Sequence, residues 1–514
     1  MVHDDLQLKR QTLEATSFGA RVAEEEVDDL AEYFVETDHW KRLYRGEVDV
    51  VYGPKGSGKS ALYSLLVARA NELFDRNIVI LAAEQPRGAP AFKDILQDPP
   101  TTEREFIALW KIYLLCLVAE LLREYDVRTP EALRVLDYLR DAKLIEEDRS
   151  SLSRLVRAVR EYARRLRDAE AVEGGVVVDP STGLLTGVNG RIILGEPGSE
   201  AAAAKIVSVD SLYRDADKAL SDLGFEVWLA IDRLDVAFAD ETELEANALR
   251  ALFKVYLDLI GYDHLSLKIF LRSDIWRRIM DAGFREASHI TRHVTIKWNR
   301  QALLNLIIRR VLRNESIRTY YEVSDSDAVL AAVSRQQELY DRIFPAQVDL
   351  GPNKPSSLDW MIGRTRDGTG ETAPRELIHL LSSLRESQLR RFELGHEPPA
   401  DRLLFDRAAF KEALPEVSKV RLEQTLFAEN PDLKPFAELL EEQKTQHTPA
   451  TLARVWNMGD DEARQTAEAL HEAGFFERRG DRDNPVYWVP FLYRDALSMV
   501  QGSAEASIPE DSAE

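Results

Sequence analysis

A glycine-rich segment near the N-terminus constrains the fold of this 514-residue chain more than any other feature. The segment follows the pattern GxxxxGK[ST] in full and consists of Gly53, Pro54, Lys55, Gly56, Ser57, Gly58, Lys59 and Ser60, with Ala61 directly after it. The apolar run 48–52 before it predicts a strand, and residues 61–74 predict a helix. A strand, a glycine-rich loop and a helix in this order form the context in which backbone N–H groups converge on a phosphate group.

The residue types of the segment match this chemistry. Glycines let backbone N–H groups approach a β-phosphate without obstruction by Cβ atoms, and the following helix presents its positive N-terminus. Lys59 can bridge the β- and γ-phosphates, and the hydroxyl of Ser60 can coordinate Mg²⁺. The alternative interpretation is a glycine-rich surface turn. We therefore predict a binding site for ATP and Mg²⁺ at residues 53–61.

A carboxylate follows the next strong strand signal. The apolar run 227–231 predicts a buried strand that ends at Asp232. In open α/β sheets the ligand binds at the carboxyl ends of the strands, so Asp232 is expected there and is assigned to hold Mg²⁺ through water. The alternative is an ordinary aspartate that caps the following turn.

Two arginines are further candidates for contact with the triphosphate. Arg272 follows the apolar run 267–271, where a polar residue can sense the γ-phosphate; its alternative role is an ion pair with Asp274 or another acid. Arg375 follows Pro374, which suits the first turn of a helix over residues 375–384. This arginine could fold back onto the triphosphate, or it could be a solvated residue at the start of a helix.

These motifs together resemble the P-loop ATPases with an additional central strand, a group that includes the AAA+ and STAND proteins. More narrowly, residues 23–26, 33–37 and 53–61 look like those of a largely uncharacterised family of bacterial P-loop ATPases associated with anti-phage or other conflict systems. The resemblance implies that the strand before the glycine-rich loop (Walker A) is not adjacent to the strand that ends at Asp232 (Walker B). It also implies a helical lid and a C-terminal winged helix.

The sequence departs from this pattern directly after Asp232. Many P-loop ATPases have a glutamate there that polarises the attacking water, whereas this chain has Arg233. Asp235 could serve instead, or it could be purely structural. We therefore expect slow hydrolysis of ATP.

The expected fold class is α/β, with a P-loop NTPase core around a parallel sheet. The predicted organisation is an N-terminal helical segment 1–45, the ATPase core 46–298 with a helical and β insertion at about 125–220, a helical lid 299–445, a winged-helix-like domain 446–500 and a disordered acidic tail 501–514. Within the insertion, residues 130–167 are predicted to be helical throughout.

Composition limits the functions open to this chain. Lys and Arg number 67 against 89 Asp and Glu, a formal net charge of −22, which excludes an even layer of positive charge for nucleic acid but not a local basic patch. The single cysteine, Cys116, excludes a disulfide framework and a cysteine metal cluster within one chain. No secretory signal and no run of eighteen apolar residues is present, so we expect a cytoplasmic protein without membrane contact.

Charge also bears on possible DNA binding. In the predicted winged-helix-like domain, the helix over 460–473 carries five acidic residues against Arg464 alone, which predicts contact with protein and not with DNA. A basic stripe lies elsewhere, on one face of a predicted helix in the insertion. This stripe is the candidate surface for nucleic acid or an acidic partner, with a solvated face as the alternative; it consists of Arg154, Arg157, Arg160, Arg164 and Arg167.

Three functions follow from these observations. The favoured one is an ATP-dependent molecular switch that is read by a protein partner or by a second copy of the chain. The alternative is an origin-recognition-like DNA-binding AAA+ ATPase. A small-molecule or nucleotide kinase is the third, although the C-terminal half shows no cluster of residues for an acceptor. The sequence does not distinguish which arginine, if any, would act on a neighbouring protomer; the candidates are Arg277, Arg278, Arg309 and Arg310.

Overall fold

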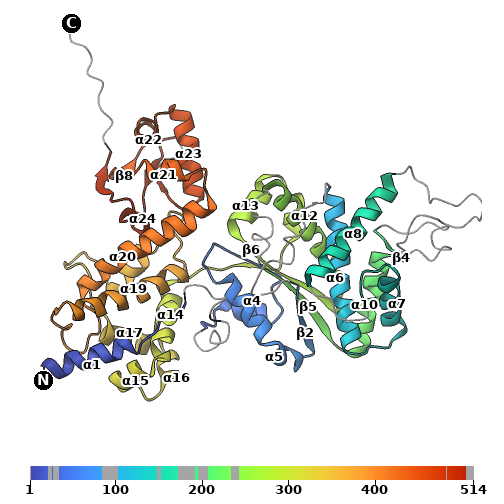
Figure 1. The fold of residues 1–514 in the computed structure, drawn as a ribbon, viewed down its shortest axis with the longest axis horizontal. Coiled ribbons are helices and arrows are strands. Elements are labelled where there is room, and N and C mark those ends of the chain that lie inside the picture. Colours follow the sequence, from blue (N-terminus) through green and yellow to red (C-terminus); the bar gives the residue numbers. More distant parts are fainter. Residues whose placement is uncertain are drawn as a thin grey trace, which may run out of the picture. The chain divides into compact units, whose positions relative to one another are not determined.

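The chain divides into two units in the computed structural model, which describes residues 2–20, 26, 34–83, 102–146, 152–171, 192–194, 207–232, 242–481 and 483–504 (Figure 1). Unit 1 contains Met1–Thr37, Lys55–Gly58 and Lys297–Glu514. Unit 2 contains Asp38–Pro54 and Lys59–Ile296. The tip of the glycine-rich loop, residues 55–58, therefore packs with unit 1, while both flanks of the loop belong to unit 2.

Unit 2 is built around a parallel five-stranded sheet with the order β2-β5-β6-β1-β7. Its strands are β1 (Val50–Gly53), β2 (Ile78–Ala82), β5 (Glu226–Ile231), β6 (Leu265–Arg272) and β7 (His293–Thr295). Strand β6 lies between β1 and β5, so the strand before the glycine-rich loop and the strand that ends next to Asp232 are not neighbours. This order and the loop after β1 give the core a P-loop ATPase fold and confirm the predicted fold class.

Helices cover this sheet, which explains why β1 is buried along its whole length and β5 from Val227 onward. The helices are α3 (Asp38–Tyr44), α4 (Lys59–Ala68), α5 (Ala70–Phe74), α6 (Glu103–Glu124), α10 (Val209–Leu223), α12 (Thr242–Leu259) and α13 (Ser273–Asp281). Fifteen of the 22 residues of α6 are buried, Cys116 among them, as its apolar composition predicts. The single helix expected over 61–74 is two helices, α4 and α5, which are interrupted at Arg69.

In the described part of the predicted insertion, two helices and two short strands precede α10. They are α7 (Pro130–Asp141), α8 (Leu152–Ala171), β3 (Ile192–Ile193) and β4 (Val207–Ser208). The prediction of one continuous helix over 130–167 is wrong, because α7 ends at Asp141 and Lys143 adopts a left-handed φ of 60°. Helix α8 buries its apolar face, and the hydroxyl of Tyr162 donates a 2.8 Å hydrogen bond to the carbonyl of Ile192.

Unit 1 is mainly helical, as expected for the region after residue 299. Its helices before residue 440 are α1 (Val2–Glu14), α14 (Arg300–Arg313), α15 (Glu315–Tyr321), α16 (Ser326–Leu330), α17 (Val333–Ile343), α18 (Ser357–Arg364), α19 (Pro374–Glu393), α20 (Arg407–Arg421), the π-helix η4 (Leu422–Phe427) and α21 (Lys434–Glu438). Arg385 on α19 donates to the carbonyls of Leu13 and Glu14 and so fixes the C-terminal end of α1.

The last part of unit 1, residues 444–504, is called the C-terminal module. It contains β8 (Lys444–His447), α22 (Pro449–Trp456), α23 (Asp460–Glu472), β9 (Glu477–Arg479), β10 (Val486–Trp488), α24 (Phe491–Arg494) and β11 (Val500–Ser503). The helix predicted over 460–473 is present as α23. Strands β8 and β11 join β9 and β10 in a four-stranded sheet with the order β11-β8-β10-β9.

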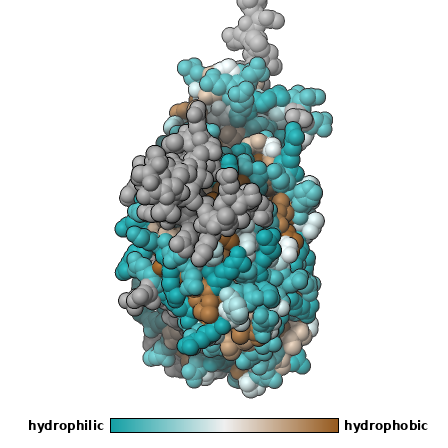
Figure 2. Space-filling view, turned by 90° about the vertical axis from the view of Figure 1, so that its right-hand side faces the viewer, coloured by the Kyte–Doolittle hydropathy of each residue, from teal (hydrophilic) through white to brown (hydrophobic). Residues whose placement is uncertain are grey.

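The face drawn in Figure 2 is mostly hydrophilic, with apolar residues in small patches. Within the described ranges, no helix combines the length and the apolar character needed to cross a membrane.

Candidate nucleotide-binding site

The glycine-rich loop has the backbone shape that its glycines predict. Gly56 and Gly58 have φ values of 79° and 99°, in the left-handed region where L side chains are strained. A Cβ atom added to Gly58 would have no described heavy atom within 4 Å. The loop therefore leaves an open cradle at Gly58, directly before the N-terminus of α4, where backbone dipoles favour an anion.

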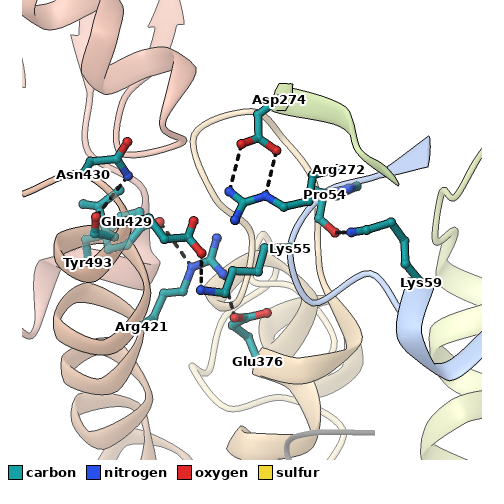
Figure 3. A network of polar contacts seen from close by, with 11 residues as sticks. Pro54, Lys55, Lys59, Arg272, Asp274, Glu376, Arg421, Glu429, Asn430 and Tyr493 are labelled. Atoms are coloured by element: carbon teal, nitrogen blue, oxygen red, sulfur yellow. Dashed lines mark hydrogen bonds and ion pairs between the residues drawn. The ribbon is translucent and has the colours of Figure 1, made fainter. Parts of the chain in front are cut away.

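The side chains that follow line this cradle. Lys59 is buried, and its Nζ donates hydrogen bonds of 2.9 Å to the carbonyl of Gly53 and 3.0 Å to that of Pro54 (Figure 3). Ser60 lies in the first turn of α4 and is partly exposed. The hydroxyl oxygen of Ser57 is buried without a hydrogen-bond partner among the described residues. These groups fit a triphosphate, which offers oxygens to N–H and O–H donors.

The tip of the loop is fixed by side chains of unit 1. The ammonium of Lys55 forms an ion pair with Glu429, which follows the π-helix η4 (Figure 3). The indole N–H of Trp298 donates a 2.8 Å hydrogen bond to the carbonyl of Ser57. A Cβ atom on Gly56 would lie 3.2 Å from the Cβ of Arg375 and 3.3 Å from that of Ala373, so α19 begins directly against the loop tip.

Strand register places Asp232 and Arg272 at the same edge of the sheet as the loop. Ile231, Ile269 and Val50 pair across β5, β6 and β1, and Gly53 pairs with Arg272. Asp232 follows Ile231 directly, is only 3% exposed and lies at the carboxyl end of β5. Since the sheet is parallel, the loop, Asp232 and Arg272 all lie at its carboxyl edge, as predicted.

Arg272 is paired within its own turn. Its Nε and Nη2 donate to the two carboxylate oxygens of Asp274 at 3.1 and 2.8 Å. Burial favours the neutral form of Asp274, but the guanidinium of Arg272 outweighs this effect and lowers the pKa of the carboxyl. This pairing is one of the two roles that the sequence leaves open for Arg272.

Arg375 contrasts with Arg272. Pro374 occupies the first turn of α19, as predicted, and Arg375 follows it in a half-buried position beside Gly56. Its Nε is buried without a hydrogen-bond partner, and the guanidinium forms no ion pair or hydrogen bond with any described residue. A cation beside the loop tip whose donors are not used within the described chain is suited to an anionic ligand.

The neighbouring residue, Glu376, belongs to a buried network that sequence reasoning missed. Its Oε1 accepts a 2.8 Å hydrogen bond from Nη1 of Arg421 at the end of α20, and its Oε2 is buried without a hydrogen-bond partner among the described residues. Arg421 lies in line with the buried residues Val417 and Leu414. An arginine on the apolar face of a helix is unusual, and this position in the sequence could have identified Arg421.

Mg²⁺ is the metal that this donor set fits. Ser60 and Asp232 offer one hydroxyl and one carboxylate, and Mg²⁺ commonly takes its other ligands from phosphates and water. Within the described residues, no group of three or more His, Cys, Asp or Glu side chains could hold a metal ion by itself. Arg233 and Asp235 lie outside the described residues.

The four arginines considered for action on a neighbouring protomer differ in their surroundings. Arg310 is buried and pairs with Glu26, and Arg278 pairs with Glu245 at 2.6 Å. Arg309 is half-buried and donates to Asn305, and burial lowers its pKa. Arg277 is exposed on α13 and has no ion pair or hydrogen bond within the described part of the chain.

The basic stripe lies on α8. Arg154 and Arg157 are exposed and Arg160 is half-buried, opposite the buried residues Leu155 and Val159. None of these three arginines is without a partner. Arg164 and Arg167 lie on the same helix, but their side chains lie outside the described part of the structure.

Comparison with known proteins gives similarities to solved structures only. No family model and no curated protein sequence matches the chain. The Orc1 protein of Aeropyrum pernix in complex with DNA is 14% identical over 90% of this chain and 91% of its own, with a TM-score of 0.33. A Walker-type ATPase of Pyrococcus abyssi is 12% identical over 90% and 96%, with a TM-score of 0.36. The A. pernix ORC2 protein in ADPNP–ADP complexes is 11% identical over 90% and 91%, with a TM-score of 0.30. At these values the similarities carry no argument about the ligand or function of this chain.

Proposed function

We propose that this protein binds ATP with Mg²⁺ at residues 53–61, hydrolyses it slowly and acts as a nucleotide-dependent molecular switch. The observation that carries the proposal is the open cradle at Gly58, which lies between a buried strand and a helix N-terminus. In this proposal Lys59 binds the β- and γ-phosphates, while Ser60 and Asp232 hold the metal. Bound Mg²⁺ would neutralise charge that develops on the phosphates.

Two arginines complete the proposed site. Arg375 binds the triphosphate, because it lies beside Gly56 with donors that no described residue uses. Arg272 senses the γ-phosphate after exchanging its bond to Asp274 for one to the ligand, which has an energetic cost. The role of Asp235 in activating water rests on its position in the sequence alone.

Slow hydrolysis follows from Arg233, which stands where many P-loop ATPases have a water-polarising carboxylate. Steady-state phosphate release by the purified protein with ATP and Mg²⁺ tests the activity. Release without any added acceptor, abolished in Lys59→Ala, supports an ATPase and argues against a kinase. Rapid release in the wild type would contradict the proposed slow switch.

The alternative function is an origin-recognition-like DNA-binding ATPase, which the helix pair and hairpin of the C-terminal module favour. The acidic charge of the C-terminal module opposes a role in DNA binding. Asp460, Asp461 and Glu462 occupy the first turn of α23, and the guanidinium of Arg464 donates to the carbonyl of Asp483. We therefore propose that the module, which we assign as winged-helix-like, contacts protein.

If DNA binds at all, we propose that it binds the stripe on α8. Replacement of Arg157, Arg160 and Arg164 with glutamate should then abolish retention of DNA and flatten its salt dependence, because each lost phosphate contact lowers the log–log slope by about 0.9. Arg464→Glu is the matched control and should have little effect. The opposite result would favour the origin-recognition-like function.

The division into an N-terminal segment, a core with an insertion, a lid and a C-terminal domain stays a proposal, as does a cytoplasmic location. We also propose that a protein partner or a second copy reads the nucleotide state. A role in anti-phage defence rests on the sequence resemblance alone.

A further inference from the structure

A buried arginine connects the loop tip with the C-terminal module, and all the groups concerned belong to unit 1. Arg421 is 9% exposed and lies where α20 passes into the π-helix η4. Besides its 2.8 Å bond to Glu376, its Nε lies 3.5 Å from the hydroxyl of Tyr493 (Figure 3). Its Nη2 lies 3.6 Å from a carboxylate oxygen of Asp367. Burial disfavours the charge of Arg421, but the nearby acidic groups outweigh this effect and raise its pKa.

One end of this network touches the proposed phosphate site. A Cβ atom on Gly56 would lie 3.5 Å from Oε2 of Glu376, the oxygen that has no hydrogen-bond partner among the described residues. The same turn of α19 carries Arg375. A shift of the loop tip on nucleotide binding would therefore displace Glu376 and Arg375 together.

The other end lies in the C-terminal module. Tyr493 is fully buried on α24, and the N–H of Ala496 donates a 3.0 Å hydrogen bond to the hydroxyl of Ser418 on α20. The turn before α19 is equally close, because Gly368 donates to the carbonyl of Gly474 at 2.7 Å. A Cβ atom on Gly368 would lie 2.2 Å from the carbonyl oxygen of Phe476, so this contact leaves no room for a side chain.

The segment between these ends is irregular. The π-helix η4 begins directly after Arg421, and Glu429, the partner of Lys55, follows its end. A π-helical turn within an α-helix is rare and is frequently found at functional sites. The loop tip thus lies against Glu376 on α19, which pairs with Arg421, and it pairs with Glu429, which follows Arg421 beyond η4.

We propose that Arg421 is a positioning residue that couples nucleotide binding at the phosphate loop to the C-terminal module. It holds Glu376, and with it Arg375, against the loop tip, and it connects this contact to Tyr493. The inference rests on the proposed nucleotide binding, and it adds that the C-terminal module responds to the bound nucleotide. Because such coupling is reciprocal, the module also changes the affinity of the loop for nucleotide.

Hydrogen exchange of the amides in 444–504, with and without a non-hydrolysable ATP analogue and Mg²⁺, tests the proposal on the full chain. Wild type and Lys419→Met, an exposed control on the same helix, should show a nucleotide-dependent change in exchange rate of about fivefold or more, the range typical of coupling between two sites. Arg421→Met should bind the analogue while this change falls to about the twofold level or less.

If Arg421→Met does not fold, Tyr493→Phe, which removes only one hydroxyl, tests the coupling in its place. A titration of each variant with the analogue separates the two claims. If the wild type does not bind the analogue, the proposed function fails and takes this inference with it. If the wild type binds but exchange in the module does not change, the coupling role of Arg421 is wrong while nucleotide binding stands. The same conclusion follows if Arg421→Met and Tyr493→Phe both keep the full change, or if Tyr493→Phe keeps it where Arg421→Met does not fold.

Discussion

Replacement of Gly58 with alanine separates the stability of the loop from its proposed ligand binding. At a φ of 99° an L residue costs roughly 1–2 kcal/mol. For a unit of about 150–250 residues this corresponds to a decrease in Tm of roughly 2–8 °C. The new Cβ meets no described atom within 4 Å, so crowding adds nothing further.

The effect on ligand binding should be larger. If the cradle holds a phosphate group, the Cβ of Gly58→Ala occupies space that the ligand needs and disrupts at least one hydrogen bond from a backbone N–H to a charged oxygen. Such a bond contributes roughly 1.5–3 kcal/mol, which corresponds to affinity weaker by about 10- to 150-fold. Thermal unfolding and titration with a fluorescent ATP analogue and Mg²⁺ measure the two effects separately.

Gly56→Ala is the matched control, because Gly56 also has a positive φ of 79°. There the new Cβ would lie 3.2 Å from the Cβ of Arg375 and 3.3 Å from that of Ala373, so crowding adds to the conformational cost. We expect Gly56→Ala to lower Tm more than Gly58→Ala does. A folded Gly58→Ala variant that binds the analogue as tightly as the wild type would refute the assignment of the cradle to phosphate.

Three further predictions concern the edge of the sheet and the start of α19. Arg375→Gln should change the free energy of unfolding by no more than about 0.5 kcal/mol, because no described residue pairs with Arg375. The same variant should show a weaker preference for ATP over ADP in competition titrations, and an unchanged preference would remove Arg375 from the site. Arg272→Gln should be less stable than the wild type at neutral pH, because Arg272 lowers the pKa of Asp274 in the folded state. This stabilisation is present above the pKa that Asp274 has in the unfolded chain, and it is lost as the pH falls through the pKa in the folded state. Denaturation curves of the two proteins that differ equally at about pH 7 and about pH 2 would contradict the pairing. Asp235→Asn should slow phosphate release by about 10²- to 10⁴-fold if Asp235 activates water, and an unaffected rate would place the base elsewhere.

The sheet and its loop were predictable because their signals are local. Mainly apolar runs predict β1, β5 and β6, and the glycines of the loop predict left-handed backbone, which Gly56 and Gly58 adopt. The strand order follows from the resemblance, because no local pattern states that β6 lies between β1 and β5.

The contacts around the loop tip were not predictable in the same way. Glu376 and Arg421 are 45 residues apart, and Lys55 and Glu429 lie in different parts of the sequence. Which charges meet depends on how α19, α20 and η4 pack, and hydrophobic periodicity does not contain that information. The break between α7 and α8 was missed for a different reason. Residues 142–146 contain no glycine or proline, and Lys143 takes the left-handed conformation instead.

Nucleotide binding by the glycine-rich loop is the central claim, and Lys59 tests it most directly. Its ammonium donates to the carbonyls of Gly53 and Pro54, so Lys59→Ala removes the cation of the cradle without removing a residue of the apolar core. Equilibrium titration of both proteins with a fluorescent ATP analogue and Mg²⁺, with thermal unfolding as the check on folding, gives the answer. We predict that the folded variant loses most of its affinity for the triphosphate. Equal affinity in a folded Lys59→Ala protein would contradict the assignment of this loop as the nucleotide site.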